Sequence, residues 1–144
     1  MRRIFIALAI LLALGNTAEA KNYITLESPS GNTIVDETGK WILGPYKDLH
    51  VNYIIDYGER YVYASFYDNS QKRYINLNTM VYLPAGYDYE FSYEYAKALT
   101  KGGFKLVKSD GTYAINDVVS AYNYCSDNLI YGKKGEFWYL YNIS

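Results

Sequence analysis

The chain has little of the two residue types that most often carry catalysis and cross-links. Its 144 residues include one histidine, His50, and one cysteine, Cys125. A lone cysteine cannot form an internal disulfide, and a lone histidine cannot build a histidine-based metal cluster or proton relay. No nucleophile motif surrounds Cys125. We therefore expect no catalytic residues and no metal site. We expect Cys125 to be a small buried core residue, with a disulfide that joins two copies of the chain as the alternative.

A surplus of charge of one sign is also absent. The chain has 14 Lys and Arg residues against 15 Asp and Glu residues, for a formal net charge of -1. This balance provides neither a basic surface for nucleic acid nor a polyanionic tail. The glycine pair Gly102-Gly103 lacks the spacing of a phosphate-binding loop, so we expect no cofactor. Together these absences favour a protein that is not an enzyme and does not bind nucleic acid.

Only one long hydrophobic run is present, and it lies at the start of the chain. Arg2 and Arg3 precede the apolar run Ile4 to Leu14, and Ala18-Glu19-Ala20 has the small-x-small pattern of a signal peptidase site. A helix of that run would be about 17 Å long, short of the ~30 Å hydrocarbon core of a membrane. We therefore predict a signal peptide at residues 1–20, cleaved after Ala20, and a single domain at 21–144. The mature protein is expected in the periplasm or secreted, without a membrane span.

What the chain has in abundance is tyrosine, with 19 Tyr against 5 Phe and 2 Trp. Tyrosine favours strands, because its ring packs on a sheet face while its hydroxyl reaches water. Short alternating stretches separated by turn residues predict antiparallel hairpins. The structural turns include Gly39, Asp110, Gly111 and Gly135. The predicted strands are 33–35, 40–43, 61–66, 73–77, 80–83, 96–100, 104–108, 112–115, 129–131 and 137–141.

Internal similarity indicates about three imperfect repeats. Residues 34–43 match 106–115 and, more loosely, 75–83, each reading as strand, polar turn and strand. In this alignment Thr79 takes the place of the turn glycine, and Phe104 recurs as Phe137. The first repeat is longer by an insertion near His50 to Tyr57, which makes His50 a surface residue of a loop. We predict an all-β antiparallel β-hairpin array that curls into a partial propeller or small open barrel. Its last strand, at 137–141, is expected to pair with an N-terminal strand at 23–26.

The repeats resemble the WG (KWG-type) repeats of bacterial exported proteins. The matching stretches are Phe91 to Leu99, an aromatic-serine segment, and Lys101 to Asp110-Gly111, a glycine-aromatic start that leads to a glycine turn. The resemblance covers nearly the whole mature chain but is degenerate, because no Trp-Gly dipeptide is present. It implies an interaction scaffold without established chemistry, and hence a binding module that contacts a protein.

Aromatic side chains are the candidate binding residues. They alternate along a segment that has a strand period, although residues 92–99 also include good helix formers. The candidates are Tyr87, Tyr89, Phe91, Tyr93 and Tyr95, together with Tyr61 and Tyr63. Two interpretations remain open: a core with its rim, or an exposed recognition platform. The partner is expected to be a protein. Alternatives are carbohydrate or peptidoglycan binding by stacked tyrosines, and a small eight-stranded outer-membrane barrel, whose strands would need ~9 to 11 residues.

Overall fold

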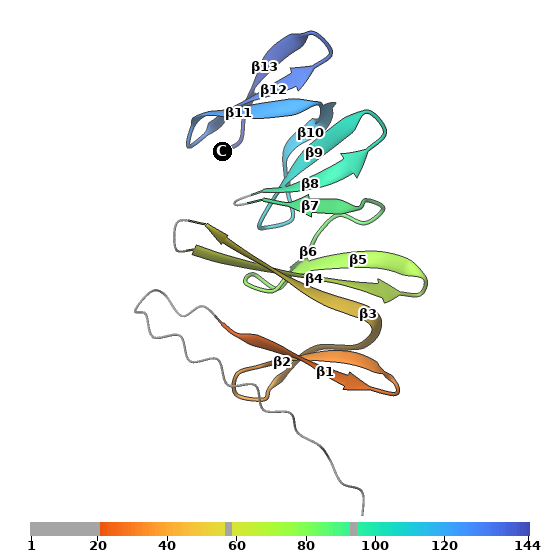
Figure 1. The fold of residues 1–144 in the computed structure, drawn as a ribbon. Coiled ribbons are helices and arrows are strands. Elements are labelled where there is room, and N and C mark those ends of the chain that lie inside the picture. The colour runs from red at the N-terminus through yellow and green to blue at the C-terminus, as the bar shows by residue number, and fades with distance from the viewer. Residues whose placement is uncertain (1–20, 57–58, 93–94) are drawn as a thin grey trace, which may run out of the picture.

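The computed structural model describes residues 21–56, 59–92 and 95–144, so the predicted signal peptide lies outside the described residues (Figure 1). All regular elements of this part of the chain are strands, and they pair antiparallel, which confirms the all-β hairpin class. Accordingly, none of the described residues forms a helix that would span a bilayer. The strands are β1 (Tyr23–Ser28), β2 (Gly31–Asp36), β3 (Trp41–Asp56), β4 (Glu59–Asp68), β5 (Gln71–Asn76), β6 (Val81–Tyr82), β7 (Tyr89–Phe91), β8 (Tyr95–Thr100), β9 (Gly103–Lys108), β10 (Tyr113–Val119), β11 (Ala121–Ser126), β12 (Leu129–Lys134) and β13 (Phe137–Asn142).

The strands form four layers that are stacked in a column (Figure 1). Layer 1 contains β1, β2 and the first part of β3. Layer 2 contains the rest of β3 with β4, β5 and β6. Layer 3 contains β7 to β10, and layer 4 contains β11 to β13. Each layer is an open antiparallel meander, as expected for strands that are joined by short turns.

The long strand β3 connects the first two layers. It pairs with β2 up to Tyr46 and with β4 from Lys47 onward, and the ladder is irregular between Lys47 and His50, where Asp48 has a φ of 50°. The predicted loop insertion near His50 is therefore wrong. His50 is exposed, but it lies in a strand opposite Ser65. The chain bends at this irregularity without leaving the strand, so β3 belongs to two layers. The polar residues around the bend therefore lie in a strand and not in a loop.

Three hydrophobic cores lie between successive layers. Core 1 joins layers 1 and 2 and includes Tyr23, Ile34 and Phe66. Core 2 joins layers 2 and 3, and core 3 joins layers 3 and 4. An inner layer is therefore apolar on both faces, one facing the N-terminal end of the column and the other facing the C-terminal end. Burial of apolar area in these cores, at about 25 cal/mol per Å², stabilises a chain that has no internal disulfide.

The layers repeat in register as well as in architecture. Each contains a hairpin with a two-residue turn, closed by the pairs Ser28↔Gly31, Asp68↔Gln71, Thr100↔Gly103 and Lys134↔Phe137. Residues at the same distance before the closing pairs occupy aligned positions in the four layers. Five positions before the first residue of each pair are Tyr23, Tyr63, Tyr95 and Leu129. The three tyrosines belong to cores 1, 2 and 3 in that order, so all of them face the C-terminal end. The next position, Ile24, Ala64, Ala96 and Ile130, faces the N-terminal end in every layer. Aligned positions therefore have the same orientation throughout the column.

This register changes two sequence-based alignments. Because Gly103 aligns with Phe137, the counterpart of Phe104 is Trp138 rather than Phe137. In the middle turn the left-handed residue is Met80, with a φ of 58°, rather than Thr79. Six residues separate the paired residues Ile75 and Tyr82, whereas five separate the aligned pairs Val35 with Trp41 and Val107 with Tyr113. The extra residue moves the position with a positive φ from Thr79 to Met80.

The turns of layers 1 and 3 match closely. Gly39 and Gly111 have φ values of 82° and 81°. The amide of Gly39 donates to the carbonyl of Asp36 at 2.9 Å, and that of Gly111 donates to the carbonyl of Lys108 at 3.0 Å. The carboxylate of Asp110 accepts hydrogen bonds from the amide and hydroxyl of Thr112, at 2.9 and 2.6 Å. The hydroxyl bond is the main cause of the lowered pKa of Asp110.

The two ends of the column do not pair with each other. β1 pairs with β2 alone and β13 with β12 alone among the described strands, and they lie at opposite ends (Figure 1). The predicted pairing of the last strand with the N-terminal strand is therefore wrong. Stacking separates the ends along the column, whereas such a closure needs the strands to curl around a common axis.

Candidate functional site

The tyrosines selected from the sequence lie mainly inside the column. Tyr63 and Tyr89 are buried in core 2, and Tyr95 is buried in core 3. Tyr61, Tyr87 and Phe91 pack partly buried against core 2, and Tyr93 lies outside the described residues. The ring of Phe91 stacks on Tyr63 with 4.3 Å between centroids. Burial raises the pKa of Tyr63 to about 12.

The expected single strand through these aromatics is a pair of strands. β7 ends at Phe91, and β8 begins at Tyr95 and runs antiparallel to it. Tyr89 therefore faces layer 2, whereas Tyr95 faces layer 4. An alternating pattern cannot reveal this reversal, because the pattern continues across the connection between two strands.

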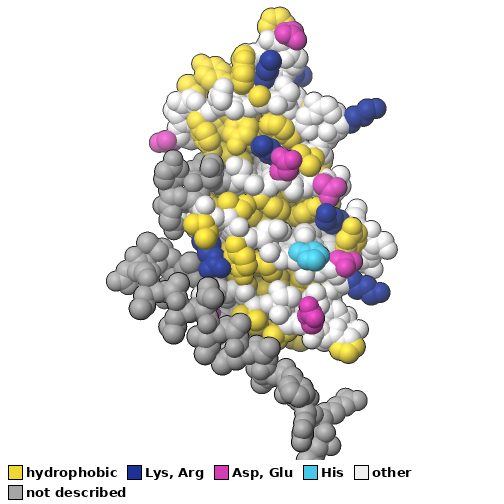
Figure 2. All heavy atoms as spheres, viewed as in Figure 1, with side chains coloured by type: hydrophobic (Ala, Val, Ile, Leu, Met, Phe, Trp, Pro, Cys, Tyr) yellow, Lys and Arg dark blue, Asp and Glu magenta, His cyan; other side chains and the backbone are white. Residues whose placement is uncertain are grey.

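The exposed aromatic side chains lie instead at the ends of the column. On layer 4, the outward side carries Tyr131 opposite Leu140, and Trp138 opposite Lys133. We call Tyr131, Trp138 and Leu140 the C-terminal face. Their exposed fractions are 40%, 46% and 52%. Figure 2 shows hydrophobic side chains around the upper end of the column, over this layer.

Layer 1 has a matching outward side. Ile24 lies opposite Val35, and Val35 also lies opposite Trp41, which places the three on one side of the sheet. Leu26 is two residues from Ile24 and shares its orientation. We call Ile24, Leu26 and Trp41 the N-terminal face. All three are exposed, Trp41 at 60%.

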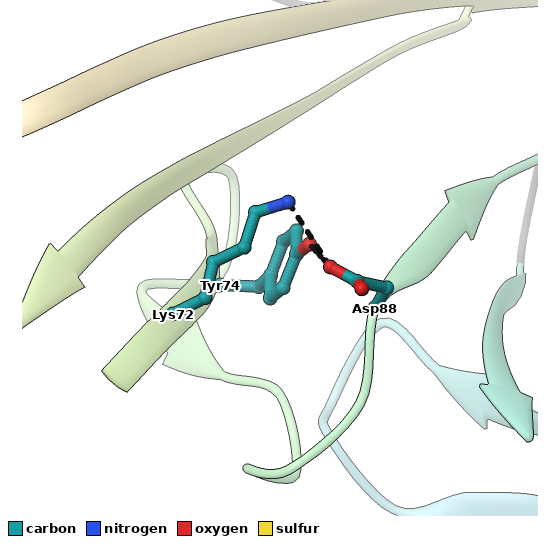
Figure 3. A network of polar contacts seen from close by, with 3 residues as sticks. All are labelled: Lys72, Tyr74 and Asp88. Carbon is teal, nitrogen blue, oxygen red and sulfur yellow. Dashed lines mark hydrogen bonds and ion pairs between the residues drawn. The ribbon is translucent and has the colours of Figure 1, made fainter. Parts of the chain in front are cut away.

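A polar network joins layers 2 and 3 at the side of the column. The ammonium of Lys72 and the hydroxyl of Tyr74 donate to the same oxygen, Oδ1 of Asp88, at 3.0 and 2.8 Å (Figure 3). The hydrogen bond from Lys72 is the largest cause of the lowered pKa of Asp88. The side chains of Lys72 and Asp88 are 41% and 66% exposed, so the ion pair adds little to the stability of the fold.

An open cavity of about 380 Å³ lies beside this network. Its lining combines two aromatic rings with hydrogen-bonding groups. The lining side chains include Tyr67, Ser70, Gln71, Lys72, Tyr87 and Asp88. Such a mixture of ring faces and polar groups can hold a small polar molecule. This arrangement was not predicted from the sequence, because Asp88 reaches Lys72 only through the stacking of two layers.

The residues with catalytic potential are far apart in the fold. Cys125 lies in layer 4 and His50 lies in layer 2, with layer 3 between them. Cys125 is exposed, so the prediction of a buried core residue is wrong. It lies where the β11–β12 ladder shifts register, between Tyr124 and Ser126 on an edge strand. Over residues 21–56, 59–92 and 95–144, no group of three or more potential ligand side chains is arranged to hold a metal ion.

Comparison with protein-family models, with curated proteins and with solved structures finds no match to this chain.

Proposed function

We propose that this chain is an exported, non-catalytic binding module that contacts a protein partner through the C-terminal face. The supporting observation is the exposure of Trp138, Leu140 and Tyr131 on one side of a sheet whose other side packs on core 3. Large exposed apolar patches on soluble proteins commonly mark interaction sites, and Trp and Tyr are enriched among the residues that dominate binding energy. We further propose that the layers are degenerate WG repeats, which accords with an interaction role.

Capture from envelope extract tests the protein partner. The purified chain is immobilised as wild type, as Leu140→Lys and as Ile55→Lys. Ile55 is a control of similar chemistry, because it is exposed but belongs to an inner layer. We expect wild type and Ile55→Lys to retain the same protein and Leu140→Lys to lose it. Retention that does not depend on Leu140, or no specific retention at any salt concentration, would contradict the proposal.

Export is tested separately by measuring the mass of the recovered protein, which identifies its N-terminal residue. The N-terminal features support cleavage after Ala20, so the protein recovered from outside the bacterial cytoplasm should begin at Lys21. Recovery of an intact N-terminus beginning at Met1 would contradict cleavage.

A second candidate function is saccharide binding in the cavity beside Lys72 and Asp88. The rings of Tyr67 and Tyr87 could stack on a sugar, while Gln71 and the ion pair offer hydrogen bonds. Titration with peptidoglycan fragments should then change tyrosine fluorescence in the wild type and not in Tyr67→Ala. An unchanged signal in the wild type would argue against this function and leave the protein-binding proposal unaffected.

A further inference from the structure

We propose that the partner of the C-terminal face is the N-terminal face of a second copy, so that two chains stack head to tail and continue the column. This inference rests on the proposed function and names its partner. The argument begins from the internal interfaces. Each of the three cores forms where the C-terminal side of one layer meets the N-terminal side of the next. The chain therefore already contains three examples of the contact that two copies would make.

The register shows which residues of the C-terminal face correspond to buried ones. Counted from the two-residue turns, Leu140 aligns with Leu106 and Trp138 aligns with Phe104. Leu106 is 0% exposed beneath layer 4, whereas Leu140 is 52% exposed. Phe104 likewise packs against core 3. The C-terminal face thus has the side chains of an internal face but lacks the next layer.

The residues of the N-terminal face also align with residues of the inner layers that pack in the cores. Leu26 aligns with Phe66 and Ala98, which pack in cores 1 and 2. Ala98 is 0% exposed and Leu26 is 51% exposed. Trp41 follows the Gly39 turn as Tyr113 follows the Gly111 turn, and Tyr113 packs against core 2. Leu26 and Trp41 therefore stand where inner layers make contact with the preceding layer.

The two faces are different surfaces, so the contact between copies is heterologous. Every internal interface pairs a C-terminal side with an N-terminal side, and none pairs two sides of the same kind. A contact of this type leaves one free face at each end of the dimer. Further copies therefore add to the stack as the protein concentration rises, unless the geometry closes a ring. Hydrophobic burial on both faces drives the association.

Complementary blocked variants test this arrangement. Leu140→Lys blocks the C-terminal face and leaves the N-terminal face intact, whereas Leu26→Lys does the reverse. Sedimentation is measured on the exported, purified chains, after circular dichroism has shown that each variant is folded. We expect the wild type and the control Ile55→Lys to associate in a concentration-dependent way. Each blocked variant alone should associate at least about tenfold more weakly, and should therefore be monomeric at concentrations at which the wild type associates.

The decisive sample is the equimolar mixture of the two blocked variants. The intact C-terminal face of Leu26→Lys can bind the intact N-terminal face of Leu140→Lys, so the mixture should form a one-to-one dimer and nothing larger. If Leu26→Lys alone still dimerises while Leu140→Lys does not, two C-terminal faces pair with each other and the head-to-tail arrangement is overturned. A wild type that stays monomeric at all concentrations overturns self-stacking. In that case Leu140-dependent capture of a different protein would preserve the proposed function, and its absence would remove both.

Discussion

Gly39 and Gly111 provide a matched pair that measures the contact between layers 2 and 3. Their φ values are 82° and 81°, so alanine meets the same backbone strain at both. The left-handed conformation costs a non-glycine residue about 1 to 2 kcal/mol, of which about 0.4 to 1 kcal/mol is offset by the reduced entropy of the unfolded chain. The surroundings differ. A Cβ at Gly39 meets nothing within 4 Å, whereas one at Gly111 lies 2.9 Å from Cγ1 of Val81 and 3.0 Å from the carbonyl oxygen of Tyr82.

We therefore expect Gly39→Ala to lower the free energy of unfolding by about 0.5 to 1 kcal/mol. Gly111→Ala should cost about 1 to 3 kcal/mol more, because it overpacks a contact with a stiff β-branched side chain and a backbone oxygen. Urea unfolding followed by circular dichroism measures both variants. For a chain of this size each kcal/mol also lowers Tm by about 3 to 5 °C.

Val81→Ala makes the test specific to the contact. Removing Cγ1 of Val81 should recover part of the extra cost of Gly111→Ala and leave the cost of Gly39→Ala unchanged. Gly135, which also has a positive φ and open surroundings, is a further control for the strain alone. Equal costs at Gly39 and Gly111 would refute the reasoning, because they would mean that the layer 3 turn does not touch β6.

Three further outcomes follow from the same geometry. Met80→Gly should raise the free energy of unfolding by about 0.5 kcal/mol in urea unfolding, because Met80 is exposed and its φ of 58° strains a residue that has a Cβ. A fall in the free energy of unfolding would contradict the left-handed conformation of Met80. Gly132→Ala should cost about 1 to 3 kcal/mol, because the new Cβ would lie 3.2 Å or less from three side chains, including Ile115 across core 3; an unchanged urea midpoint would count against the packing of layer 4 on layer 3. Stability should fall as pH rises from about 10 toward 12, because burial raises the pKa of Tyr63 to about 12 and also raises the pKa of Tyr89, so that the folded state retains protons that the unfolded state releases. This contribution is full below about pH 10, and equal urea midpoints at about pH 9 and 11 would contradict it.

The sequence predicts the strands and turns better than their placement. Alternation and turn residues identify the all-β class, and the Gly39 and Gly111 turns are visible because only glycine readily takes a positive φ. The strand through His50 was missed, since a polar bend within one strand has the composition of a loop. The reversal between Phe91 and Tyr95 was missed because aromatic alternation continues through it.

The end faces were also missed, although the sequence carries a signal for one of them. The run Phe137 to Tyr141 has five consecutive large apolar residues, so both sides of that strand are apolar. One side packs toward core 3, which leaves the other to form the C-terminal face. One side of this strand is exposed because the strand lies in the last layer of the column. The order in which the layers stack cannot be predicted from the local sequence pattern.

Tryptophan quenching tests most directly the central claim, that the C-terminal face of one copy binds the N-terminal face of the next. The chain has two tryptophans, and they lie on opposite ends: Trp41 on the N-terminal face and Trp138 on the C-terminal face. Trp41→Phe and Trp138→Phe therefore each leave one reporter. Acrylamide quenching is measured over a range of protein concentrations in each variant. The account predicts that both reporters are readily quenched in dilute protein and become protected together, with a common midpoint, as concentration rises. A Trp138 that is shielded in dilute monomer, or that stays fully quenchable while chains associate, would contradict it.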